Sequence, residues 1–166
     1  MKTKDLLRMA LLTAVALIIF MVEAQIPAPV PVPGVKLGLA NVVTVYAVFV
    51  LGPARTLMVL LCRVFLGAVF SGQMMTLLYS LGGGLLCWCV MCLLCKVLTE
   101  NQIWVCSVFG AICHNIGQMI VAVAITRTPT LLSYLPVLLV SGILTGAFTG
   151  FAAQFLIAHL KKIGQK

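Results

Sequence analysis

The sequence has very few charged residues, and acidic residues are almost absent. Of 166 residues, 8% are charged and only three are acidic, whereas 63% are hydrophobic. A soluble domain carries roughly a quarter charged residues, so this composition excludes that class and indicates a membrane protein. No polar interval is long enough to fold alone. We therefore expect one all-α integral membrane domain over residues 1–166.

The scarcity of acids also argues against catalysis. Asp5, Glu23 and Glu100 lie far apart in the chain, so no carboxylate cluster is available for a metal-dependent reaction. The only glycine triplet, Gly82–Gly84, is not followed by the Lys-Ser/Thr of a phosphate loop. We predict no catalytic residue, no cofactor and no ATPase activity in this chain. The protein is therefore expected not to be an enzyme.

Seven cysteines all lie within apolar runs, where cysteine behaves as a small hydrophobic residue. Four of them, Cys87, Cys89, Cys92 and Cys95, crowd one predicted helix. Only the pairs spaced i, i+3 share a face, which makes a poor four-ligand cage. We predict no metal site, with a metal or cluster on these four cysteines as the remaining alternative.

Long hydrophobic runs dominate what is present. Gly52-Pro53, Ser71-Gly72, Glu100-Asn101 and Thr128-Pro129 separate them with turn chemistry. A membrane span needs about 20 residues, so the second and third runs fall short and are expected to tilt little or to stop inside the bilayer. Six transmembrane helices are predicted, approximately at residues 6–22, 37–51, 54–70, 75–95, 103–126 and 134–159.

The segment between the first two helices is unusual. Four alternating prolines, Pro27, Pro29, Pro31 and Pro33, forbid helix and favour an extended path. We expect this segment to fold over a binding site that opens on one membrane face. The preceding run could instead be a secretory signal, since its basic start and the Val22-Glu23-Ala24 sequence resemble one.

The distribution of basic residues predicts the orientation. The three loops on the side opposite the termini hold only two basic residues, Lys36 and Arg127, and Arg63 lies inside a helix. By the positive-inside rule, both termini are therefore predicted to be cytoplasmic. The basic residues on the terminal side are Lys2, Lys4, Arg8, Arg55, Lys96, Lys161, Lys162 and Lys166.

With this topology, the polar side chains converge on the outer half of the bilayer. An arginine inside a helix costs about 2.5–3.5 kcal/mol on insertion scales, so Arg63 requires a partner. The partner is either Glu23, in an ion pair between helices, or an anionic group of a ligand. The predicted substrate-binding residues are Glu23, Lys36, Asn41, Arg63, Tyr79, Asn115 and Gln118.

The stretch GVKLGLANVVTVYAVFVLGPARTLMVLLCRVFLGAVFSG, residues 34–72, closely resembles the Gx transporter family, which is also labelled heptaprenyl diphosphate synthase component I. The resemblance covers nearly the whole chain. More distantly, the chain is similar to the substrate-binding S components of energy-coupling factor (ECF) transporters. That likeness implies a six-helix bundle with a substrate site near the outer face, roofed by the loop after the first helix.

The same resemblance implies partners. In S components an Ala-xxx-Ala face of the first helix docks a transmembrane coupling subunit, and Ala10 and Ala14 match that pattern. ATPase subunits would supply the energy. We therefore expect an importer subunit, in the plasma membrane of a prokaryote, for a small vitamin-like or isoprenoid/quinone-precursor molecule.

Two alternatives remain. The first is a non-catalytic membrane subunit of a prenyl (heptaprenyl) diphosphate synthase. Such enzymes use DDxxD motifs, which this chain with its single aspartate lacks. The second is a stand-alone carrier, which would transport without an ATPase.

Overall fold

The computed structural model describes residues 3–26, 36 and 38–164. Every regular element in these ranges is helical, as the composition predicts. Two short 3-10 segments, η1 (Glu100–Gln102) and η2 (Pro129–Tyr134), precede the last two α-helices. The α-helices are α1 (Thr3–Glu23), α2 (Asn41–Leu51), α3 (Pro53–Ser71), α4 (Met74–Leu94), α5 (Ile103–Thr126) and α6 (Leu135–Gly164).

Five of these helices are long and apolar enough to cross a membrane, and α2 is not among them. With 11 residues, α2 is about 16 Å long, roughly half of the hydrocarbon core. It begins at residue 41 rather than 37 because Gly38 has a positive φ of 81° and the chain turns there. The expectation that the third helix is too short was wrong, since α3 has 19 residues and meets the length of a span.

The predicted breaks between helices are confirmed by backbone geometry. Gly52 has a φ of 83°, and Pro53 directly after it starts α3. Gly72 has a φ of 65° and caps the end of α3. Thus the Gly-Pro and Ser-Gly signals end these helices because the chain needs backbone conformations that few other residues adopt.

Glycines bring α4, α5 and α6 into close contact. A Cβ on Gly117 of α5 would lie 2.7 Å from the carbonyl oxygen of Gly82 in α4. On α6, Gly142, Gly146 and Gly150 all face the α5 backbone or short side chains. The four-residue glycine repeat therefore serves internal packing. The triplet at residues 82–84 does not interrupt α4, which is continuous from Met74 to Leu94.

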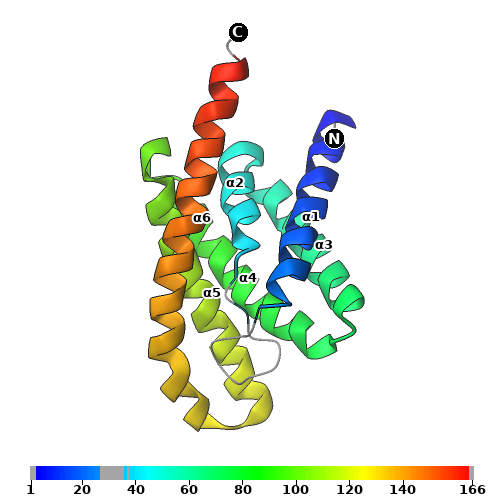
Figure 1. The fold of residues 1–166 in the computed structure, drawn as a ribbon, viewed down its shortest axis with the longest axis vertical. Coiled ribbons are helices and arrows are strands. Elements are labelled where there is room, and N and C mark those ends of the chain that lie inside the picture. The colour runs from blue at the N-terminus through cyan, green and yellow to red at the C-terminus, as the bar shows by residue number, and fades with distance from the viewer. Residues whose placement is uncertain (1–2, 27–35, 37, 165–166) are drawn as a thin grey trace.

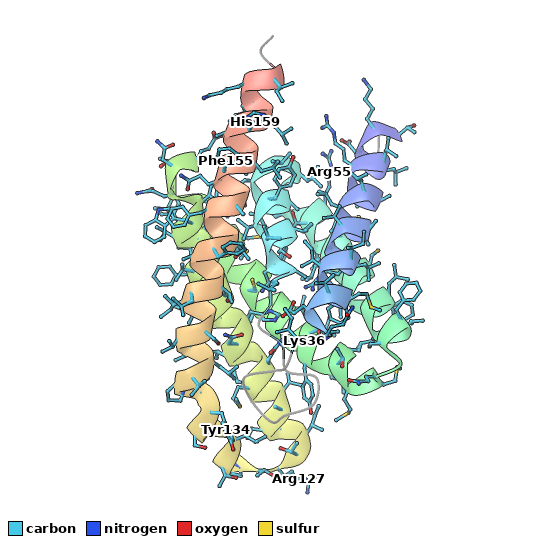
Figure 2. All side chains as sticks on the ribbon, viewed as in Figure 1. Lys36, Arg55, Arg127, Tyr134, Phe155 and His159 are labelled. Atoms are coloured by element: carbon cyan, nitrogen blue, oxygen red, sulfur yellow. The ribbon has the colours of Figure 1, made fainter. Side chains whose placement is uncertain are left out.

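In Figure 1, α1 and α3 lie on one side, α5 and α6 on the other, and α2 and α4 between them. The start of α1 and the end of α6 lie at the same end of the bundle. An ion pair between Asp5 and Arg55, at 3.1 Å, ties α1 to α3 at this end. Arg127 lies at the opposite end (Figure 2).

Candidate substrate-binding site

Arg63 lies in the interior of the bundle. It sits in α3, and its side chain is only 4% exposed. It lies near His114, and it is close enough to Glu23 for the two charges to interact. Its Nε and Nη2 atoms are buried and have no hydrogen-bond partner among the described residues. A guanidinium is always charged, and buried polar groups in proteins are normally hydrogen-bonded, so two buried donors without a partner are unusual.

Glu23, the last residue of α1, does not form the expected ion pair with Arg63. Its Oε1 atom accepts a hydrogen bond of 2.5 Å from the backbone N–H of Gly38. Among the described residues, ion pairs within 4.0 Å join only Asp5 to Arg55 and Glu100 to Lys161. The carboxylate is therefore used to hold the backbone ahead of α2, and the Glu23–Arg63 contact is only electrostatic.

Lys36 links this part of the backbone to two helices. Its backbone N–H donates to Oε1 of Gln118 in α5 at 3.3 Å. Its Nζ lies 3.5 Å from the centroid of the Phe20 ring in α1, a cation–π contact. Figure 2 shows Lys36 within the bundle, well above the end that carries Arg127. The residue therefore lies over the interior rather than extending away from it.

The contact with Lys36 also determines the state of His114. A backbone N–H can only donate, so the Gln118 atom that faces Lys36 is the amide oxygen. The Gln118 amide nitrogen then donates to Nε2 of His114, 2.8 Å away. A ring that accepts at Nε2 is neutral and carries its proton on Nδ1. His114 and Gln118 thus form one oriented unit, and the imidazole adds no charge beside Arg63.

Asn41, the first residue of α2, is 2% exposed, and within the described part of the chain both its side-chain amide atoms lack a hydrogen-bond partner. It lies directly beside Gly38, where an added Cβ would be 2.8 Å from Nδ2 of Asn41 and 3.1 Å from Cδ2 of His114. Asn41 therefore stands next to the Glu23–Gly38 tie and the His114–Gln118 unit. Its amide nitrogen is a donor, and its amide oxygen an acceptor, that no described residue uses.

The structure thus brings five predicted site residues, from four helices and the segment between α1 and α2, into one polar cluster: Glu23, Lys36, Asn41, Arg63 and Gln118. We call this set, together with His114, the Arg63 cluster. Residues 27–35 and 37, including the four prolines, lie outside the described residues.

Two predicted site residues are placed elsewhere. The Asn115 side chain donates to the backbone carbonyl of Leu138 in α6 at 2.6 Å. It also lies against Gly142, so it packs α5 onto α6. Tyr79 is buried in an apolar group with Met119, Ala122 and Leu138. The structure gives neither residue a contact within the Arg63 cluster.

Sequence reasoning did not assign three residues that shape the cluster. Gly38 supplies the N–H that donates to Glu23. Its position as a glycine inside an apolar run is the feature of the sequence that could have identified it. Gly83 lies against His114 and Gln118, where a Cβ would be 2.7 Å from the carbonyl oxygen of His114. His114 itself was not among the predicted substrate-binding residues, although Gln118 was. The two residues in fact pair at i, i+4 spacing, which places them one above the other on a helix.

The predicted docking residues Ala10 and Ala14 are exposed on α1. They line a groove of about 410 Å³ between α1 and α3, which Met58, Cys62 and Leu66 also line. Only four residues of α1 are buried, Met9, Ala16, Phe20 and Glu23. Most of the other residues of this helix are exposed, and that surface is open to lipid or to another protein.

For the described part of the chain, no group of three or more His, Cys, Asp or Glu residues could hold a metal ion. The seven cysteines are free thiols. Cys87 is fully buried and contacts Met91 and Cys106 through an apolar cluster.

Comparison with known proteins places the chain in a family. No curated protein and no solved structure matches it. The family described as heptaprenyl diphosphate synthase component I matches residues 12–156. This match spans all residues of the Arg63 cluster and most of the chain. The protein therefore belongs to the heptaprenyl diphosphate synthase component I family.

Proposed function

We propose that this protein is the substrate-binding subunit of an ECF-type, ATP-driven importer. It would capture a small vitamin-like or isoprenoid/quinone-precursor molecule from the outer face of the membrane. The observation that carries the proposal is the Arg63 cluster, in which a buried arginine and a buried asparagine keep hydrogen-bonding atoms without partners. Such groups are costly in a bundle interior unless a ligand uses them.

The position of the cluster supports capture from one side. The backbone at Lys36 and Gly38, which follows α1, is tied to Gln118 and to Glu23 above the cluster. We assign the end that carries both termini to the cytoplasm, because Arg55, Lys161 and Lys162 lie there. The cluster then faces the outer side of a prokaryotic plasma membrane.

Energy would come from partners, since the chain has no phosphate loop. The groove between α1 and α3, with Ala10 and Ala14 at its wall, is the surface that we assign to the transmembrane coupling subunit. Small side chains let helices approach closely, and α1 is exposed along most of its length. ATPase subunits would bind through that coupling subunit.

The test is co-purification after the groove is filled. Ala14→Leu should abolish recovery of the membrane subunit and the ATPases while ligand binding is unchanged. Ala152→Leu is the matched control, because Ala152 is exposed on α6 away from the groove. If the partners are recovered equally with Ala14→Leu and the wild type, the assignment of this surface is wrong.

The family name favours a second candidate, a non-catalytic membrane subunit associated with a prenyl (heptaprenyl) diphosphate synthase. This alternative predicts a soluble synthase as the main companion of the purified protein. It also predicts that Arg63→Ala leaves the function of the complex unchanged. Recovery of a synthase, with neither ATPases nor a bound small molecule, would favour the alternative over the importer.

A further inference from the structure

The charges of the Arg63 cluster do not balance. Arg63 and Lys36 are basic, and Glu23 is the acid that interacts with both of them. His114 is neutral, because its Nε2 accepts a hydrogen bond from Gln118. One positive charge therefore remains in excess. Inside a membrane protein such a charge is normally neutralised by a nearby opposite charge.

The excess charge can be located on one residue. The Nζ of Lys36 lies over the Phe20 ring, which provides a favourable surface for a cation. Glu23 is held by the N–H of Gly38 and makes no ion pair with Arg63 within 4.0 Å. Lys36 and Glu23 thus each have a partner close by. Arg63 is the basic group of the cluster whose hydrogen-bonding needs stay open.

The two unpartnered atoms of Arg63 are informative as a pair. Nε–H and Nη2–H point to the same side of the planar guanidinium and form one of its two-pronged edges. This edge matches the spacing of two oxygens on a carboxylate or a phosphate, which it binds through two parallel hydrogen bonds. An unpartnered edge of this kind, on a side chain only 4% exposed, is thus a preformed receptor for an oxyanion.

Asn41 adds a second polar element. Its amide atoms are also buried and unpartnered, and it stands beside the tie between Glu23 and Gly38. The amide nitrogen can donate to a further oxygen of an anion, and the amide oxygen can accept from a hydroxyl or an N–H. In contrast, Gln118 is already used by Lys36 and His114.

We infer that the substrate of this site carries a carboxylate or phosphate group, bound by the Nε–Nη2 edge of Arg63 with Asn41 beside it. The inference rests on the proposed binding function and names the chemical class of its ligand. The anion completes the charge balance of the cluster. A neutral ligand would leave Arg63 uncompensated, and a cationic one would add to the excess.

The test begins with the full chain purified in an uncharged detergent from its own membranes. Native mass spectrometry followed by extraction identifies any bound small molecule. We expect a carboxylate or phosphate compound that is lost at least tenfold from Arg63→Lys, which keeps the charge but lacks the two-pronged edge. Arg55→Lys, at the terminal end of the bundle, is the matched control and should retain it. A bound molecule that is neutral or cationic would overturn the inference.

A second measurement decides the case in which no molecule co-purifies. Sodium acetate and sodium phosphate are each compared with sodium chloride at equal ionic strength. A saturating oxyanion should raise the melting temperature of the wild type by about 5 °C. No shift, or the same shift in Arg63→Lys, would contradict the inference. Asn41→Asp is nearly identical in shape to the wild type and should also lose the shift in melting temperature, because its carboxylate repels an oxyanion at the site. This variant provides the test if Arg63→Lys does not fold.

The same experiment distinguishes two sources of the oxyanion. A bound molecule that partitions into the aqueous phase is a soluble acid, whereas one that enters the organic phase is an anionic lipid or prenyl compound. Either one supports the inference. Binding of the oxyanion is measured on this chain, whereas the importer is tested by recovery of the membrane subunit and the ATPases from the native membranes. A retained oxyanion without recovery of those partners would leave the inference standing and count against the importer.

Discussion

The carboxylate of Glu23 accepts its hydrogen bond from the backbone of Gly38, 15 residues further along the chain, and not from the side chain of Arg63. An acid and an arginine that look like natural partners in the sequence therefore have separate tasks. Glu23 holds the backbone that leads into α2, and Arg63 keeps one edge of its guanidinium open.

The first prediction concerns the tie itself. Glu23→Leu removes the acceptor for the Gly38 N–H and should lower the free energy of unfolding by about 1.5–3 kcal/mol, the usual range for a hydrogen bond to a charged group. Glu23→Gln keeps an acceptor oxygen and should lose less. Denaturation in mixed micelles measures both variants. Equal losses would mean that the charge of Glu23, and not its acceptor oxygen, is the stabilising feature.

A second prediction compares two adjacent glycines of α4. In Gly83→Ala the new Cβ meets the backbone carbonyl of His114 at 2.7 Å, and the backbone cannot easily move away. We expect a loss of about 1–3 kcal/mol in stability together with weakened ligand binding. In Gly84→Ala the new Cβ meets only the end of the flexible Leu60 side chain at 2.9 Å. This matched control should be milder in the same unfolding and binding measurements, and an equal effect would contradict the role assigned to Gly83.

A third prediction separates two amide residues of α5. Asn115→Ala removes the hydrogen bond to the Leu138 carbonyl and should cost about 0.6–1.7 kcal/mol in stability. Ligand affinity should stay within twofold of the wild type. Gln118→Ala removes the contacts to Lys36 and His114 and should weaken ligand binding more than stability. Isothermal titration on both variants checks this, and the opposite ranking would place Asn115 in the binding site.

A fourth prediction concerns orientation. A green fluorescent protein fused after the C-terminus should fluoresce, because it folds when it remains in the cytoplasm. A periplasmic alkaline phosphatase fused at the same position should be inactive. Inserting the same reporters next to Arg127 should reverse both results, since Arg127 lies at the other end of the bundle (Figure 2). Active phosphatase at the C-terminus would invert the proposed topology.

Much of the helical architecture could be predicted because it depends on local chemistry. Long apolar runs separated by Gly-Pro and Ser-Gly pairs require helices that end at those pairs, and the helices do end there. The start of α2 was misplaced by four residues, since apolar residues on both sides of Gly38 hide a turn that only its positive φ reveals. Hydropathy describes where a chain prefers to lie, and it carries little information on backbone dihedrals.

The candidate site could be predicted less completely, because it depends on how each helix is rotated. Depth in the bilayer follows from residue position, and it placed Glu23, Lys36, Arg63 and Gln118 in one predicted site. These four residues do lie close together, and their role in binding stays a prediction. Rotation follows from packing over long distances. Neither the pairing of Asn115 with α6 nor the burial of Tyr79 among apolar side chains could be inferred from spacing within one helix. His114 was missed for the same reason.

Because α1 buries few residues against the bundle, the lipid around it affects how other proteins bind to this side of the molecule. Only four of its residues are buried, and most of its surface is in contact with acyl chains once the protein is in a bilayer. A protein that binds here replaces annular lipid and uncovers no part of the core. Association on this side should therefore depend on bilayer thickness and acyl-chain order, and the same two proteins could assemble in one lipid mixture and separate in another.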